Sequence, residues 1–128
     1  MATTMERTVV VIEDDQGCSD LIAELVQDLG YRVLIHDRAE AAFTQVLKQQ
    51  PSLVVLDVML SDGDGLNVLR DIRQEPRTRE IPVLLCTAAL SDLSGRQEQL
   101  KDGRTEIVTK PFHIEQFTTA LHQLLPAD

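Results

Sequence analysis

The feature that most limits the fold of this 128-residue chain is the apolar run Leu53–Leu56, which is followed directly by Asp57. Four consecutive apolar residues between Pro51–Ser52 and a glycine-bearing loop are typical of a β-strand buried on both faces, as in a parallel sheet covered by helices. Open α/β sheets place their chemistry at the carboxyl ends of such strands. Asp57 is therefore the first candidate for a functional residue, although an Asp in this position often only ends a strand or caps a helix.

Four other segments also have the composition expected of strands. They are Thr8–Ile12, Tyr31–His36, Pro82–Thr87 and Glu106–Thr109. Apolar residues recur at helical spacing between and after these strands. The helical patterns are Leu21–Leu29, Asp37–Lys48, Leu66–Ile72, Asp92–Asp102 and Ile114–Leu125. Strands that alternate with helices at this spacing predict an α/β fold, a doubly wound five-stranded parallel sheet with helices on both faces.

Two of the helical patterns carry additional signals. Asp37 and Glu40 have the spacing of a capping box, which predicts that the second helix opens at Asp37. The pattern Asp92–Asp102 is the weakest of the set, because only Leu93 and Leu100 can anchor it to a core. We therefore expect that helix to be loosely held.

Length and charge narrow the classes of function. A chain of 128 residues fits one domain, here 1–128 with a core of about 7–125, and it contains no repeat or linker. If this is the whole protein, it has no room for an output domain and must act by binding a partner. The net charge of -9 argues against direct nucleic-acid binding and favours a partner with a basic surface.

Neither the first residues of the chain nor its cysteines indicate export. Residues 1–7 lack the apolar region of a signal peptide, and no apolar stretch is long enough to cross a bilayer. Cys18 and Cys86 lie far apart without metal-ligand spacing, so we expect reduced thiols, with Cys86 in the core. The prediction is a cytoplasmic protein without membrane insertion.

Polar side chains follow several of the predicted strands. Glu13, Asp14, Asp57, Thr87 and Lys110 all stand where a strand ends, and these ends share one edge of a parallel sheet. Clustered carboxylates repel one another unless they share a proton or a cation, and oxygen ligands of this kind suit Mg²⁺. Lys110 and the Thr87 hydroxyl add a positive charge and a donor for phosphoryl oxygens. The set indicates a carboxylate that accepts phosphate.

These residues stand in motifs that resemble a known family. The motifs are the acidic pair Glu13–Asp14, the strand end Leu56–Leu60, Thr87–Ala88 and Thr109–Phe112. Together they resemble the receiver domain of two-component response regulators, in particular stand-alone chemotaxis and sporulation regulators, over nearly the whole chain from residue 9 to residue 125. The resemblance implies the flavodoxin-like strand order 2-1-3-4-5.

The same resemblance implies roles for the acidic residues. Asp57 is expected to accept a phosphoryl group from a histidine kinase or histidine phosphotransfer protein. Asp14, Asp57 and the backbone carbonyl of Met59 are expected to bind Mg²⁺, with Glu13 acting on the metal through water. Met59 and Ala89 occupy positions that orient the hydrolytic water in relatives, and because neither has a carboxylate or amide, we expect slow self-dephosphorylation.

The resemblance also assigns the remaining site residues. It makes Thr87 the switch hydroxyl, Lys110 the phosphate counter-ion and the Lys110–Pro111 bond a cis peptide. Four positions depart from the family pattern. Glu13 stands where an Asp is commoner, and Ser61 replaces a usual proline. Ile107 replaces an aromatic residue whose rotamer follows Thr87, and Arg104 replaces a small residue beside the output face. We therefore expect the chemistry to be intact and the readout to be altered.

The expected function is that of a signalling phosphoacceptor and not of an enzyme, with an unknown protein target. The alternative is a receiver-like docking module that works without phosphorylation, against which the intact Asp57, Thr87 and Lys110 count. A flavodoxin-like FMN protein would share the fold, but the acids 13–15 would repel a bare phosphate. A haloacid-dehalogenase-type phosphatase needs a second acid where Met59 stands.

Overall fold

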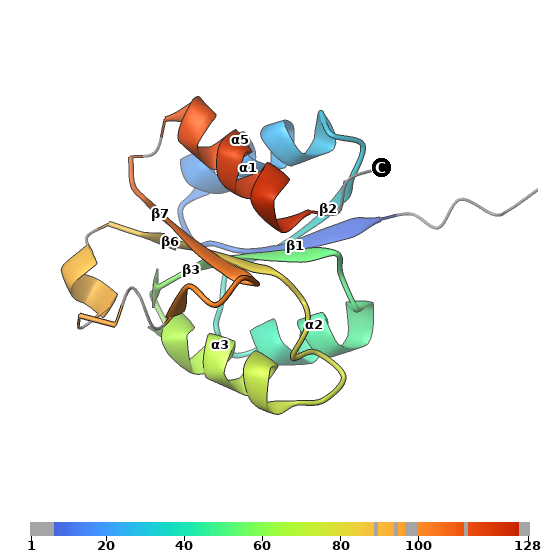
Figure 1. Ribbon diagram of the computed structural model, residues 1–128, viewed down its shortest axis with the longest axis vertical. Helices are drawn as coiled ribbons and strands as arrows, with labels where there is room; N and C mark the ends of the chain where they lie inside the picture. Colours follow the sequence, from blue (N-terminus) through green and yellow to red (C-terminus); the bar gives the residue numbers. More distant parts are fainter. Residues whose placement is uncertain (1–6, 89, 94, 97–99, 112, 126–128) are drawn as a thin grey trace, which may run out of the picture.

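The computed structural model describes residues 7–88, 90–93, 95–96, 100–111 and 113–125 (Figure 1). Its main sheet has the order β2-β1-β3-β6-β7, and every neighbouring pair is parallel. The five strands are β1 (Thr8–Ile12), β2 (Arg32–His36), β3 (Leu53–Asp57), β6 (Val83–Thr87) and β7 (Thr105–Thr109). The expected order 2-1-3-4-5 is confirmed.

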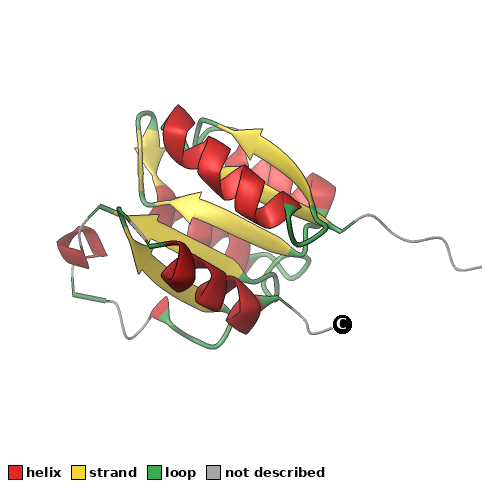
Figure 2. Cartoon of the chain, turned by 90° about the horizontal axis from the view of Figure 1, so that it is seen from above, coloured by secondary structure: helices red, strands yellow, loops and turns green. Residues whose placement is uncertain are grey.

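Helices cover both faces of the sheet, as predicted. The α-helices are α1 (Gln16–Gln27), α2 (Ala42–Gln49), α3 (Gly65–Gln74) and α5 (Ile114–Leu124), and a short 3-10 helix, η1, spans Leu90–Leu93. In Figure 1 α1 and α5 lie on one side and α2 and α3 on the other, and Figure 2 shows the same layers from above. None of the described helices is long and apolar enough to span a membrane.

Burial on both faces explains why the central strands are continuously apolar. In β1 the side chains of Val9 and Val11 belong to the core under α1 and α5. Val10 and Ile12 belong to the second core, which packs against α2 and α3. Successive strand residues point to opposite faces, so a sheet with two cores needs an apolar residue at every position.

The helical patterns are confirmed in part. In α5 Phe117 and Leu121 are buried, whereas Ile114, which we placed on the same apolar face, is 55% exposed. The predicted helix Asp92–Asp102 falls partly on residues 94 and 97–99, which lie outside the described part of the chain. Of its two expected anchors, Leu93 is fully buried at the end of η1 and Leu100 packs against the second core.

The predicted capping box at Asp37 and Glu40 is wrong. Helix α2 begins later, and its N-cap residue, Ala41, makes no side-chain capping bond. The backbone N–H groups of Ala39 and Glu40 donate instead to the carboxylate of Asp62, at 2.7 and 3.1 Å. A carboxylate distant in sequence has taken the place of the local cap, and it ties the β2–α2 loop to the segment after Asp57.

That segment forms a small hairpin that the sequence did not reveal. Strands β4 (Met59–Leu60) and β5 (Gly63–Asp64) pair antiparallel immediately after β3. The hairpin closes onto the sheet at Gly65, whose N–H donates to the Val58 carbonyl at 2.7 Å. A Cβ atom at Gly65 would overlap the carbonyl oxygen of Asp57 and lie 2.9 Å from Val58 Cα. Glycine at position 65 therefore allows the backbone of Asp57 to lie against the start of α3.

We expect Gly65→Ala to lower the free energy of unfolding by about 2–3 kcal/mol, because backbone atoms must move to accommodate the added methyl group. The matched control is Gly17→Ala in α1, where the new Cβ would meet only Asp15 Oδ2 at an ordinary 3.6 Å. There stability should stay constant or rise by up to about 1 kcal/mol. Urea unfolding measures both variants, and equal effects would contradict the assignment of strain to position 65.

A second feature that the sequence did not reveal lies at the opposite end of the sheet. The guanidinium of Arg73, on α3, donates through Nη1 to the carbonyls of Ile81 at 2.6 Å and Arg79 at 2.9 Å. Through Nη2 it donates to Thr105 Oγ1 at 2.8 Å and to the Arg104 carbonyl at 3.1 Å. One side chain thus joins α3 to the segments that enter β6 and β7.

Candidate functional site

The structure brings three carboxylates together at the carboxyl edge of the sheet. Glu13 and Asp14 follow β1, and Asp57 ends the neighbouring strand β3, where Ile12 pairs with Leu56. One carboxylate oxygen from each of the three lies within 4.8 Å of the others. Glu13 and Asp57 are buried and Asp14 is exposed. Two of the carboxylates are therefore shielded from solvent, and the third is open to water.

The ammonium group of Lys110 lies against the buried part of this cluster. Its Nζ is 2.6 Å from Glu13 Oε1 and 3.2 Å from Asp57 Oδ2. Burial favours the neutral amine, but the close approach and charge of Glu13, joined by Asp57, outweigh it and hold the pKa of Lys110 above its ordinary value. Burial also raises the pKa of Glu13; Lys110 lowers it in part, and Asp57 adds to the rise.

Backbone amides fix the orientation of the carboxylates. Asp57 Oδ1 accepts a hydrogen bond from the N–H of Met59 at 3.1 Å, and Glu13 Oε2 accepts one from Asp15 at 3.1 Å. Asp14 Oδ2 accepts one from the N–H of Ser61, in the β4–β5 hairpin, at 2.7 Å. Each carboxylate is thus held by one amide.

The donor set fits a hard divalent cation. Three carboxylates face a single ammonium group, so their mutual repulsion is only partly offset. Glu13 Oε1 lies 2.6 Å from Lys110 Nζ, and among the described residues no other donor reaches it. A buried oxygen of this kind beside an open carboxylate suits a cation that keeps some of its water, as Mg²⁺ does.

Thr87 lies in the same corner of the sheet. It is the last residue of β6 and fully buried, and its carbonyl accepts a hydrogen bond from the N–H of Lys110 at 2.7 Å. Its hydroxyl donates to Asp92 Oδ2, in η1, at 3.0 Å. The sequence predicted Thr87 as a site residue but not its partner, because Asp92 stood out there only as the first residue of a weak helical pattern.

The other expectations for the site have mixed outcomes. The Lys110–Pro111 bond is cis, as the resemblance implies. The side chain of Met59 is 61% exposed at the edge of the cluster, whereas Ala89 lies outside the described residues. Arg104 is exposed and forms an ion pair with Glu80. The hydrogen bond from the Ser61 N–H to Asp14 was not predicted from the sequence. The only sign of it in the sequence is that position 61 is not the usual proline and therefore has an N–H group to donate.

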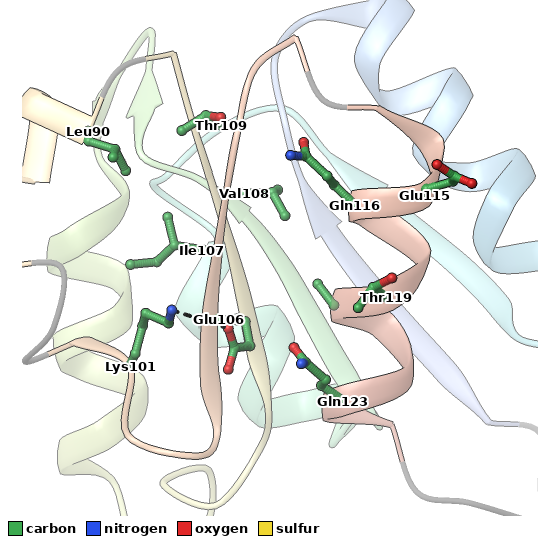
Figure 3. Close-up of a pocket in the computed structure, with 11 residues that line it drawn as sticks. Leu90, Lys101, Glu106, Ile107, Val108, Thr109, Glu115, Gln116, Thr119 and Gln123 are labelled. Carbon is green, nitrogen blue, oxygen red and sulfur yellow. Dashed lines mark ion pairs between the residues drawn. The ribbon is translucent and has the colours of Figure 1, made fainter.

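A groove of about 540 Å³ lies over β7, with α5 on one side and Leu90 and Lys101 on the other (Figure 3). It contains Ile107, the residue that stands in place of the aromatic expected from the resemblance. Gln116 and Thr119 line it from α5, and at its lower end Lys101 Nζ lies 4.0 Å from Glu106 Oε1. The groove also reaches Thr109, the β7 residue that pairs with Thr87 in β6.

Two curated relatives are regulators of about twice this length. The DNA-binding dual master transcriptional regulator RpaA of Synechocystis is 32% identical over 117 residues, which are 91% of this chain and 48% of RpaA. The probable transcriptional regulatory protein TcrX of Mycobacterium tuberculosis is 35% identical over 118 residues, which are 92% of this chain and 49% of TcrX. The chain spans about half the length of these relatives.

Solved structures match the whole fold. The receiver domain of a Pseudomonas aeruginosa sensor histidine kinase, which has a magnesium ion coordinated in its active-site cleft, superposes with a TM-score of 0.78 at 25% identity, covering 94% of this chain and 98% of that one. The BeF3-activated N-terminal receiver domain of Klebsiella pneumoniae RstA gives 0.79 at 26% identity, covering 94% and 100%. The family model of the response regulator receiver domain matches residues 9–122. The chain therefore belongs to the family of response regulator receiver domains.

Proposed function

We propose that this receiver domain accepts a phosphoryl group on Asp57 from the phosphohistidine of a histidine kinase or histidine phosphotransfer protein. The observation that carries the proposal is the position of the Lys110 ammonium group, 3.2 Å from Asp57 Oδ2 at the floor of an acidic cluster. An isolated structural aspartate would not need a buried cation together with two further carboxylates. We also propose that residues 7–125 form a single receiver domain and that a histidine kinase or histidine phosphotransfer protein is its partner.

In this reaction a carboxylate oxygen of Asp57 forms a bond to phosphorus while the bond from phosphorus to the donor's imidazole nitrogen breaks. That nitrogen keeps the bonding electron pair, and the histidine leaves as neutral imidazole because its other ring nitrogen carries a proton. Lys110 offsets the negative charge on the transferred group, and the N–H of Met59 fixes the rotation of the Asp57 carboxylate. Asp57 is consumed as an acceptor, so the domain acts as a signalling phosphoacceptor and not as an enzyme.

Asp14, Asp57 and the Met59 backbone carbonyl would hold Mg²⁺, with Glu13 contacting it through water. The metal would supply positive charge that offsets the repulsion between the carboxylates and the incoming phosphoryl group. Support comes from the three clustered carboxylates, which face a single ammonium group, and from the magnesium ion in the Pseudomonas receiver domain. Because Met59 offers no polar side chain to orient water, the phosphorylated form should lose its phosphate slowly.

Output would pass through Thr87 to a protein target. In this structure the Thr87 hydroxyl donates to Asp92, so its movement toward a phosphoryl group on Asp57 would change the contacts of η1. The groove beside Ile107 borders the same region. We propose that this face changes on phosphorylation, that the protein acts in the cytoplasm by binding a partner, and that it does not contact nucleic acid directly.

The test is incubation with acetyl phosphate and Mg²⁺, followed by electrophoresis that retards phosphoproteins and by titration with Mg²⁺. We expect Asp57→Asn to abolish labelling and weaken Mg²⁺ binding, whereas Asp20→Asn, an exposed control on α1, should behave as the wild type. Labelling that persists in Asp57→Asn would overturn the assignment. Absence of labelling of the wild type by acetyl phosphate, together with retained partner binding, would favour the phosphorylation-independent docking module.

A further inference from the structure

We infer that the backbone N–H of Ser61 positions Asp14 for metal binding, which makes Ser61 a positioning residue of the site. The inference rests on the proposed function, because it concerns the proposed Mg²⁺ ligand Asp14. It assigns to position 61 a role that depends on its main-chain donor and not on its side chain.

The contact joins two segments that are 47 residues apart in sequence. Ser61 follows β4, and its N–H lies 2.7 Å from Asp14 Oδ2, a short distance typical of a hydrogen bond to a charged acceptor. Asp14 itself is exposed. Within the described part of the chain its carboxylate has no other hydrogen bond or ion pair. The orientation of this carboxylate therefore depends on Ser61.

The donor is held firmly by its own surroundings. The next residue, Asp62, accepts hydrogen bonds from Ala39 and Glu40 at 2.7 and 3.1 Å. On the other side the hairpin closes through Gly65, whose N–H lies 2.7 Å from the Val58 carbonyl. The Ser61 N–H is therefore held in place and orients the Asp14 carboxylate. A carboxylate that is already oriented loses less conformational freedom when the metal binds.

The same support exists for the other two carboxylates. Asp57 accepts from the N–H of Met59 and Glu13 from that of Asp15. Those donors lie two residues from their acceptors, and because they are backbone N–H groups, most substitutions leave them in place. The donor to Asp14 comes from a different segment, and a proline at position 61 would remove it, since proline has no backbone N–H. This chain can orient Asp14 in this way because serine stands where the family pattern has proline.

The experiment compares Ser61→Pro with Ser61→Ala. Both variants lose the hydroxyl, but only Ser61→Pro loses the N–H. Proline at position 61 also favours an extended conformation for Leu60, which already lies in β4. Calorimetric titration of the unphosphorylated proteins with Mg²⁺ should give a Kd for Ser61→Ala within about twofold of the wild type and a Kd for Ser61→Pro about tenfold weaker, the lower end of the usual loss when a hydrogen bond to a metal ligand is removed.

Equal Mg²⁺ affinity in the two variants, or tighter binding by Ser61→Pro, would overturn the inference. The proposed function has a separate test: if Asp57→Asn abolishes labelling while Ser61→Pro binds Mg²⁺ like Ser61→Ala, only the positioning role fails. If Ser61→Pro does not fold, hydrogen exchange of the Ser61 amide in the wild type, measured with and without Mg²⁺, tests the inference instead. Protection that persists or increases with Mg²⁺ bound supports positioning, and protection that is lost on binding contradicts it.

Discussion

Phosphorylation of Asp57 should slow by at least about 10²-fold when Lys110 is replaced by Met, because a preorganised charge facing the transferred group is typically worth that much or more. Lys110 Nζ lies 3.2 Å from Asp57 Oδ2 and 2.6 Å from Glu13 Oε1. Methionine keeps most of the side-chain volume and removes the charged ammonium group, including the N–H that donates to Asp57. The measurement is the initial rate of labelling by acetyl phosphate at saturating Mg²⁺.

The control for this variant is Lys48→Met on the exposed surface of α2, which should label at the wild-type rate. An equal effect of both substitutions would mean that general charge and not the site controls the reaction. Lys110→Met should also unfold more easily in EDTA, since two buried carboxylates then lack their counter-ion. The stabilising effect of Lys110 is complete below its ordinary pKa of 10.5 and declines as the pH rises through its raised value.

The largest expected loss of stability follows from Arg73→Met, which should lower the free energy of unfolding by about 2–4 kcal/mol. Its guanidinium donates to the carbonyls of Ile81, Arg79 and Arg104 and to the Thr105 hydroxyl. The two buried acceptors, the Ile81 carbonyl and the Thr105 hydroxyl, would lose this donor, and each unsatisfied group costs about 1–3 kcal/mol where water cannot replace the donor. Urea unfolding at neutral pH gives the value.

Two further variants separate the hydrogen bonds from charge and helix propensity. Arg70→Met, on the same helix, removes a guanidinium from a side chain that is 59% exposed, and stability should change by less than about 0.5 kcal/mol. Arg73→Lys keeps the charge, but one ammonium group cannot reproduce a planar fork with two terminal nitrogens. Its stability should stay closer to that of Arg73→Met than to the wild type, and full rescue by lysine would show that charge alone matters.

The parts of the fold that the sequence predicted are those set by local pattern. The run Leu53–Leu56 is apolar because both faces of β3 are buried, and that requirement is visible in the residues themselves. The capping box at Asp37 failed for the complementary reason: its spacing was correct, but Asp62, from another segment, already satisfies the same N–H groups. Local sequence preference predicts a helix cap poorly when a group distant in sequence competes for the same N–H donors.

The candidate site shows the same division. Asp57 and Lys110 were predictable because strand ends in a parallel sheet share an edge, whatever the details of the loops. The contacts of Ser61 with Asp14 and of Thr87 with Asp92 depend on the path of a hairpin and of a 3-10 helix. No period or spacing in the sequence encodes those paths, so these contacts became visible only in three dimensions.

The hydrogen bond from Thr87 to Asp92 has a consequence for how sharply such a domain can respond. If the hydroxyl turns to a phosphoryl oxygen on Asp57, it exchanges one anionic acceptor for another, and each such bond is worth about 1.5–3 kcal/mol. The contribution of this bond therefore differs little between the two arrangements, and we expect both to be populated. A partner that binds one arrangement better by about 1.4 kcal/mol shifts the ratio tenfold. The target, as much as the phosphate, then determines how far the equilibrium moves.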